Sequence, residues 1–134
     1  LLPLYVAAEI RPSGDGPDQI DLRNTVDSEA DPFVEQARKS IAAARSYLAA
    51  RCGLGQKHRY RFEISVNHRG ARFTGDSLGV AIAVGAVAAI TLVEPLAKRI
   101  SVLPGVAFTG ALSPDGRLEA IDSEGLRKKI YGFI

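Results

Sequence analysis

The uncharged stretch of residues 78–93 constrains the fold of this chain more than any other feature. It is shorter than the roughly 20 residues that a bilayer-spanning helix needs, and it is rich in Ala and Gly, so it predicts a helix buried in a protein core. Pro95 ends this helix. The chain has 46% apolar and 24% charged residues, which is typical of a soluble globular protein with a core.

Two elements with clear periodicity precede this helix. Apolar residues recur at steps of three and four after Asp31 and Pro32, a pair that is typical of a helix start. We therefore expect an amphipathic helix over residues 32–51, closed by Gly53. Strict alternation of apolar and polar residues predicts a half-buried strand over residues 59–66.

The remaining segments predict strands, turns and one more helix. Residues 4–10 and 20–22 predict an antiparallel hairpin, residues 106–110 a buried strand, and residues 117–121 a strand that returns through a turn at 114–116. A last helix is expected from about Ser123. This order, without a repeat, predicts one α+β domain over residues 1–134, with a mixed sheet and helices packed on it.

Charge and cysteine content argue against several classes of protein. The 17 Lys and Arg residues are spread along the chain and the net charge is only +2, so we expect no nucleic-acid partner. The single cysteine, Cys52, has no internal disulfide partner, and His58 and His68 lack a familiar zinc spacing. The simplest interpretation is a cytoplasmic protein without a structural metal or a membrane partner, in which Cys52 is a packing residue.

Ser77 stands where the uncharged helix is expected to begin. The first N–H groups of a helix have no partner within it, and the helix dipole favours negative charge there, so these donors could hold an oxyanion. Gly75 and Gly79 would permit a tight turn and a close approach of substrate. The alternative interpretation is that Ser77 or Asp76 only caps the helix.

Three motifs in register make the chain similar to the Lon protease family. Gly75-Asp76-Ser77-Leu78-Gly79 resembles the nucleophile motif of the family, and Thr109-Gly110 and Gly125-Leu126-Arg127-Lys128-Lys129 resemble the two motifs that follow it. The similarity covers nearly the whole chain. It implies a Lon-type proteolytic domain that continues past residue 134.

The resemblance also implies the roles of single residues. Ser77 would be the nucleophile, Lys129 the general base and Thr109 the residue that orients the amine of Lys129. The base must be neutral, so its pKa must fall from about 10.4 to roughly 7–8. The phase of the third motif selects Lys129, and Lys128 is the alternative base. Lysines on a helix surface are otherwise solvated charges.

The chain departs from the family pattern at several positions. Asp76 replaces the usual proline and Leu78 a small alanine, while Thr74 and Ala111 stand where acidic residues are common. A serine–histidine–aspartate triad of Ser77, His68 and Asp76 is disfavoured, because Asp76 adjoins the serine and cannot easily orient the histidine.

The resemblance finally implies partners. We expect protein or peptide substrates, a homo-oligomeric ring of six subunits, and an AAA+ type ATPase module in the same chain or a partner chain. The chain has no Gly-x-x-x-x-Gly-Lys-Ser/Thr motif, so ATP and Mg²⁺ would bind only to that module and this domain needs no cofactor. The alternatives are a non-catalytic Lon-like assembly or peptide-binding domain and, more distantly, a small-molecule kinase.

Overall fold

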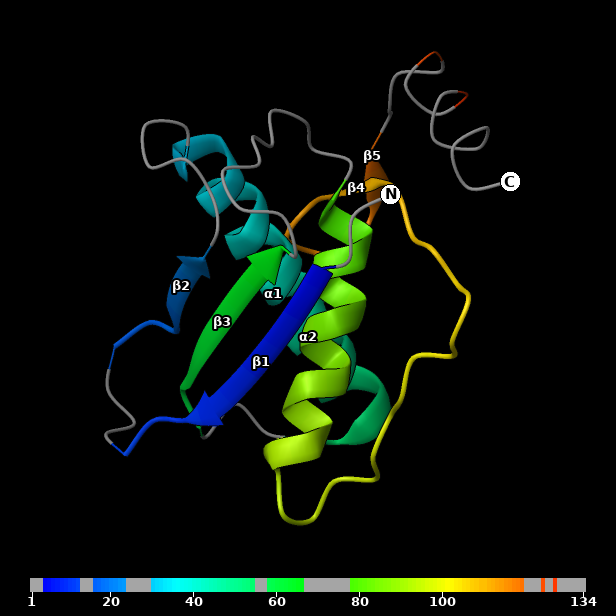
Figure 1. Ribbon diagram of the computed structural model, residues 1–134. Helices are drawn as coiled ribbons and strands as arrows, with labels where there is room; N and C mark the ends of the chain where they lie inside the picture. Colours follow the sequence, from blue (N-terminus) through cyan, green and yellow to red (C-terminus); the bar gives the residue numbers. More distant parts are fainter. Residues whose placement is uncertain are drawn as a thin grey trace.

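The computed structural model describes residues 4–12, 16–23, 30–54, 58–66 and 78–119, together with residues 124 and 127 (Figure 1). Within these residues the chain forms an α+β fold in which a mixed sheet packs against two helices. The predicted fold class is therefore confirmed at this level.

The strand β3, Tyr60–Val66, lies in the centre of a three-stranded sheet. It pairs antiparallel with β1, Leu4–Ile10, and parallel with β2, Gln19–Arg23. The side chains of Tyr60, Phe62 and Ile64 on β3 are buried, as the alternating pattern predicts. The strand ends at Val66 as predicted and begins at Tyr60, one residue after the predicted start.

The predicted hairpin of residues 4–10 and 20–22 is wrong, because β1 and β2 lie on opposite sides of β3. The helix α1, Ala30–Cys52, connects β2 to β3. Parallel neighbours need a crossover of a dozen or more residues, which a tight turn cannot supply and a helix can. The strand whose side chains are buried most completely thus takes the centre, where both of its edges are paired.

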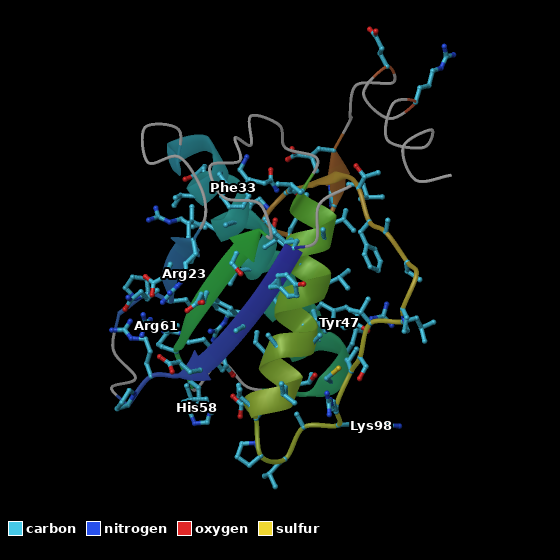
Figure 2. All side chains as sticks on the ribbon, viewed as in Figure 1. Arg23, Phe33, Tyr47, His58, Arg61 and Lys98 are labelled. Carbon is cyan, nitrogen blue, oxygen red and sulfur yellow. The ribbon has the colours of Figure 1, made fainter. Side chains whose placement is uncertain are left out.

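The helices α1 and α2, Gly79–Val93, lie side by side across one face of the sheet (Figure 1). The core between these layers contains the largest fully buried apolar side chains of the described residues, Phe62, Ile64, Ile82 and Ile90. The other face of the sheet carries ion pairs between Arg61 and Asp21 at 2.6 Å and between Arg23 and Glu63 at 3.1 Å. Arg23 and Arg61 mark this side in Figure 2.

Both predicted helices are confirmed, with small shifts in their bounds. The helix α1 begins at Ala30, so Asp31 is not its N-cap. It ends at Cys52, and Gly53 follows in the left-handed conformation that glycine favours (φ 63°). The helix α2 ends before Glu94, which is extended as residues before a proline usually are. In the described part of the chain, no helix is both long and apolar enough to span a bilayer.

A short hairpin of β4, Ala111–Leu112, and β5, Leu118–Glu119, follows the long segment after α2. The predicted turn at 114–116 is therefore in the right place. The predicted strand over 106–110 is wrong: these residues are not in a strand, and Val106 and Phe108 are exposed. The carbonyl oxygen of Gly110, the last residue of this segment, accepts a hydrogen bond from the N–H of Val80 in the first turn of α2. Gly110 is therefore bonded to a helix and not to a neighbouring strand.

Of the predicted last helix, only Glu124 and Arg127 are described, and both have helical backbone and exposed side chains. Ser123, Leu126, Lys128 and Lys129 lie outside the described residues.

Candidate functional site

The predicted site is described only at its edge. Leu78, Gly79 and Thr109 belong to the described residues, whereas Gly75, Asp76, Ser77 and the lysine Lys129 do not. His68, from the disfavoured triad, lies outside them too. The meeting of the serine and lysine side chains therefore stays a prediction.

The first turn of α2 packs directly against the segment that carries Thr109. The N–H of Val80 donates a hydrogen bond to the carbonyl oxygen of Gly110, at 3.0 Å. This bond uses one of the free donors at the helix start. Leu78 occupies the N-cap position without a side-chain cap hydrogen bond, and the first turn carries no acidic residue. Gly79, which ends the first family-like motif, thus lies beside Gly110 of the second, although about 30 residues separate them in the sequence.

Gly79 sits at a position where only a hydrogen atom fits. A Cβ atom there would lie 2.4 Å from Nε2 of Gln36, 3.0 Å from the backbone nitrogen of Leu112 and 3.2 Å from the carbonyl oxygen of Gly110. Distances below 3.0 Å are not tolerated by real Cβ atoms, so something must shift if a side chain is added. The glycine allows α1, β4 and the start of α2 to meet at one point.

Two buried polar residues of α1 adjoin this point. Gln36 is 3% exposed and Ser40 is fully buried. The Ser40 hydroxyl donates to the backbone carbonyl of Gln36 at 2.7 Å, and Nε2 of Gln36 donates to the Ser40 oxygen at 3.1 Å. Oε1 of Gln36 has no hydrogen-bond partner among the described residues. The sequence signal for this pair is two polar residues four positions apart beside the apolar stripe of α1.

An apolar pocket of about 460 Å³ opens beside the same hairpin. Its walls are the helix faces turned away from the sheet, the segment of residues 100–108 and Leu112. Several of its lining side chains are partly open to solvent, namely Tyr47, Val102, Leu103, Val106 and Phe108. Tyr47 marks this side of the molecule in Figure 2. Residues 100–114 contain no charged residue, which was the available sequence signal for an apolar surface here.

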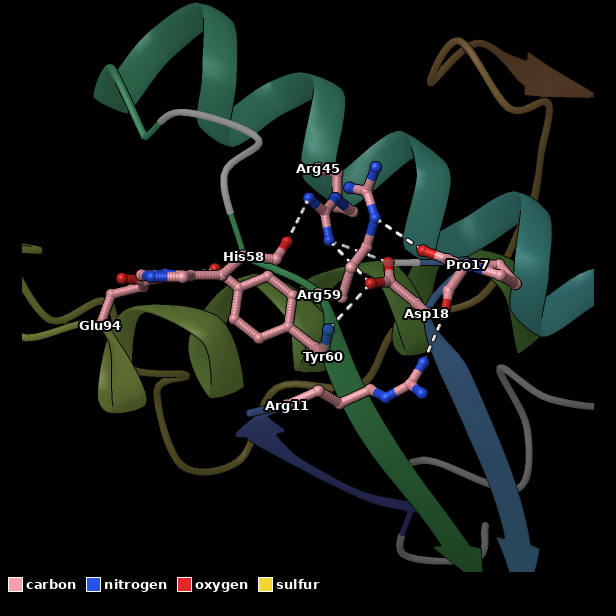
Figure 3. Close-up of polar contacts among 9 residues, drawn as sticks. Arg11, Pro17, Asp18, Arg45, His58, Arg59, Tyr60 and Glu94 are labelled. Atoms are coloured by element: carbon pink, nitrogen blue, oxygen red, sulfur yellow. Dashed lines mark hydrogen bonds and ion pairs between the residues drawn. The ribbon is translucent and has the colours of Figure 1, made fainter. Parts of the chain in front are cut away.

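A second polar cluster lies at the opposite end of α2 (Figure 3). The Asp18 carboxylate accepts hydrogen bonds from the Arg45 guanidinium and from the Tyr60 N–H, each at 2.9 Å. The Arg45 guanidinium also lies over the Tyr60 ring, 5.1 Å from its centroid. Both charged side chains of the ion pair are mostly buried, with 12% and 15% exposure.

Glu94 extends this polar cluster. Its Oε1 accepts hydrogen bonds from the Tyr60 hydroxyl and from Nδ1 of His58. Burial acts to raise the pKa of Glu94, but the two hydrogen bonds outweigh it and lower the pKa below its usual value. Burial, reinforced by Glu94, raises the pKa of the Tyr60 hydroxyl far above its usual range. Through these contacts, Asp18 before β2, Tyr60 at the start of β3 and Glu94 after α2 are all connected to Arg45 of α1.

This polar cluster lies far from the start of α2, where the predicted site is expected. The helix between Gly79 and Glu94 rises by about 1.5 Å per residue, so the two ends of α2 are on the order of 20 Å apart. The carboxylates of Asp18 and Glu94 are each held by described donors. His58 is about half exposed. The described residues contain no group of three or more His, Cys, Asp or Glu that could hold a metal ion.

Cys52 is exposed at the end of α1. The expectation that it packs in the interior is wrong, because the last turn of the helix extends past the core residue Leu48.

Comparison of the sequence with models of known protein families gives no match, and comparison with curated protein sequences gives none either.

Proposed function

We propose that this chain is a Lon-like proteolytic domain, a serine endopeptidase in which Ser77 is the nucleophile and Lys129 the general base. The observation that carries the proposal is the hydrogen bond from Val80 to Gly110. It joins the start of the helix that follows the serine motif to the segment of the Thr-Gly motif, as a shared active site requires. The three motifs in register supply the residue roles.

The chemistry follows from these roles. The Ser77 Oγ attacks the carbonyl carbon of the scissile peptide bond while Lys129 takes the hydroxyl proton and passes it to the leaving amine. Water then hydrolyses the acyl-enzyme with the same lysine as base. The free N–H groups at the start of α2 are suitable donors for the oxyanion, since the helix dipole favours negative charge there. Thr109 would orient the lysine amine.

The apolar pocket suggests the kind of substrate. Leu112 is part of the pocket wall, and its backbone nitrogen lies next to Gly79 at the start of α2. Pockets of a few hundred cubic ångströms with apolar walls bind apolar side chains. We propose that peptide substrates place such side chains there. The proposal also includes a cytoplasmic location, a homo-oligomeric ring of six subunits and an AAA+ type ATPase module in the same chain or a partner chain.

The test is cleavage of casein and of a fluorogenic peptide. Ser77→Ala and Lys129→Ala should each abolish cleavage, whereas Lys98→Ala, a change at an exposed lysine of the segment after α2, should leave it unchanged. Loss through Lys128→Ala instead of Lys129→Ala would move the base by one residue. Equal cleavage by the wild type and Ser77→Ala would reject the proposal that this chain is a serine peptidase with Ser77 as its nucleophile.

A non-catalytic peptide-binding domain is the second candidate, because the same pocket could hold an apolar side chain without cleavage. It predicts that peptide binds equally well to the wild type and Ser77→Ala and that neither protein cleaves it.

A further inference from the structure

We infer that residues 100–110, which we call the strap, form a hinged cover that closes over an apolar side chain of a bound peptide. The inference rests on the proposed function in one respect, since the peptide is taken to be the substrate. Its structural basis is the apolar pocket between the strap and the two helices. The strap and the residues that line the pocket all belong to the described part of the chain.

The strap is attached to α2 at both of its ends. Its first residue, Ile100, donates its N–H to Oγ1 of Thr91 at 3.0 Å. Its last residue, Gly110, accepts a hydrogen bond from the N–H of Val80, also at 3.0 Å. The buried Thr91 hydroxyl donates to the carbonyl oxygen of Ala88 at 3.1 Å, which fixes its orientation. Figure 1 shows the strap, drawn in yellow, running back along α2 between these two attachments.

The strap contains more chain than the distance between its attachments requires. Val80 and Thr91 lie about three turns apart on α2, which corresponds to roughly 16 Å. An extended chain from Ile100 to Gly110 reaches about 33 Å. Residues 101–108 are in neither a helix nor a strand, and within the described ranges no backbone hydrogen bond joins them to α1 or α2. The strap can therefore move toward the helices while both attachments hold.

A turn at Pro104 and Gly105 divides the strap near its midpoint. Gly105 has a φ of 76°, a left-handed conformation that glycine adopts readily, and a Cβ there would meet no atom within 4 Å. The tip of the strap is thus not held by packing. It separates two arms, residues 100–103 and 106–108, that can change their angle to the helices.

The residues around the pocket select an apolar occupant. None of the described residues that line it is charged, and its only polar side chains are the hydroxyls of Tyr47 and Ser101. A charged group placed there would lose its hydration without gaining a partner. Closure on an apolar side chain removes apolar surface of both strap and occupant from water, which favours the closed form. The strap side chains that line the pocket and are still partly exposed are Val102, Leu103, Val106 and Phe108.

The place of the pocket favours a peptide side chain as this occupant. Ala83, which lines the pocket, lies one helical turn after Gly79 on α2. Leu112 also lines it, and the backbone nitrogen of Leu112 is 3.0 Å from the place where a Cβ of Gly79 would be. The pocket therefore begins beside the residue that ends the nucleophile motif. A side chain bound there belongs to a peptide whose backbone passes the start of α2.

A single tryptophan in the strap reports closure, because the chain has no tryptophan of its own. We choose Leu103→Trp in a protein that also carries Ser77→Ala, so that peptide is bound but not cleaved. The matched control is Leu118→Trp, since Leu118 and Leu103 are equally exposed, at 75% and 74%, and only Leu103 lines the pocket. The ligand is a blocked pentapeptide with a central phenylalanine flanked by glycine and serine. Analogues with a central glycine or glutamate are the reference peptides.

We expect the phenylalanine peptide to shift the emission of Leu103→Trp to shorter wavelength, as burial of the ring requires, and to leave Leu118→Trp unchanged. The glycine and glutamate peptides should cause no shift at the same concentrations.

A second pair of variants tests the attachment of the strap. Thr91→Val removes the acceptor for the Ile100 N–H, so more chain must be ordered when the strap closes. The dissociation constant of the phenylalanine peptide should rise roughly 3- to 10-fold, which is the effect expected of a single hydrogen bond. Thr91→Ser keeps the hydroxyl and should bind the peptide as tightly as the protein with Thr91.

The outcomes separate this inference from the proposed function. If casein cleavage depends on Ser77 but the phenylalanine peptide leaves the emission of Leu103→Trp unchanged, the strap is rejected and the peptidase stands. If the emission shifts as expected but the wild type and Ser77→Ala treat casein alike, the peptidase is rejected and the strap stands as the cover of a peptide-binding site. A shift that follows protein concentration without peptide would show that a second copy covers the pocket, and this result would overturn the inference.

Discussion

Gly79 is the residue at which three parts of the fold meet, and its contacts make a specific prediction. Gly79→Ala gains helix propensity of about 1 kcal/mol but forces the new Cβ into Gln36, Leu112 and Gly110. Because overpacking costs about 1–3 kcal/mol, we expect a net loss of about 1 kcal/mol in the free energy of unfolding, measured in urea.

The control for this prediction is a double-mutant cycle. Gln36→Ala removes the nearest atom, so Gly79→Ala should be less destabilising by about 0.5 kcal/mol or more in that background. Additive effects of the two changes would show that the carboxamide does not touch the start of α2.

Glu94 gives a prediction about pH. Glu94→Gln loses the charge that receives the Tyr60 and His58 hydrogen bonds, so we expect it to lower the free energy of unfolding by about 1–3 kcal/mol at pH 7. The folded-state pKa of Glu94 lies below the ordinary value of 4.5. The carboxylate therefore stabilises the fold fully above pH 4.5, and this contribution disappears as the pH falls through the folded-state pKa.

Urea unfolding at pH 7 and at pH 3 measures this dependence. The difference between the wild type and Glu94→Gln should shrink on acidification, whereas Glu119→Gln, on an exposed residue, should have little effect at either pH. A difference that grows at pH 3 would contradict the lowered pKa of Glu94.

At the scale of single residues, the sequence identified the motif residues but not their neighbours. In the sequence, nothing distinguishes Gln36 and Glu94 from other polar residues. Only the packed structure shows that Gln36 lies against Gly79 and that Glu94 accepts a hydrogen bond from Tyr60. The predicted residues Leu78, Gly79 and Thr109 are found at the junction of α2 and the following segment.

At the scale of elements, the pairing of β3 with both β1 and β2 makes a prediction about hydrogen exchange. The amides of β3 are bonded or buried on both sides, so they should exchange only through opening of the core. We expect slower exchange in β3 than in β2, measured by mass spectrometry of peptides. Equal protection of β1 and β2 with a less protected β3 would instead indicate the hairpin that the structure excludes.

The packing of α2 on β1 makes a second prediction at this scale. A Cβ at Gly85 would lie 2.7 Å from Cγ2 of Val6 and 3.1 Å from its Cβ, so Gly85→Ala should push the helix from the sheet. We expect it to lower the free energy of unfolding by about 1–3 kcal/mol.

The matched control is Gly85→Ala in a Val6→Ala background. Removal of the Val6 methyl groups frees the space, so the added Cβ should then be tolerated or favourable. Equal destabilisation in both backgrounds would mean that α2 and β1 do not touch at Gly85.

The three elements that the sequence predicted well each carry their pattern within themselves. Residues 59–66 alternate, residues 32–51 have a helical apolar stripe, and residues 78–93 are uncharged, so the burial of each can be read locally. The hairpin and the strand over 106–110 needed knowledge of a partner. In the structure β1 and β2 each pair with β3 and not with each other. Gly110, at the end of residues 106–110, hydrogen bonds to the first turn of α2 and not to a strand.

At the scale of the whole molecule, the sequence predicted the α+β class but not the strand order. The α+β class follows from the succession of periodic segments, whereas the order β1-β3-β2 depends on which strand buries most apolar surface. The pocket beside Leu112 also exists only in the assembled fold, because α1, α2 and residues 100–108 all contribute to it. The serine–lysine pair remains the prediction on which the function depends.

Covalent labelling tests that pair most directly, because it does not require the natural substrate. A serine-directed fluorophosphonate should add one group to the wild-type protein, and peptide mapping should place it on Ser77. Lys129→Ala should suppress the reaction and Lys98→Ala should not. Labelling at another serine, or labelling of Ser77 that is as fast without Lys129 as with it, would contradict the proposed mechanism.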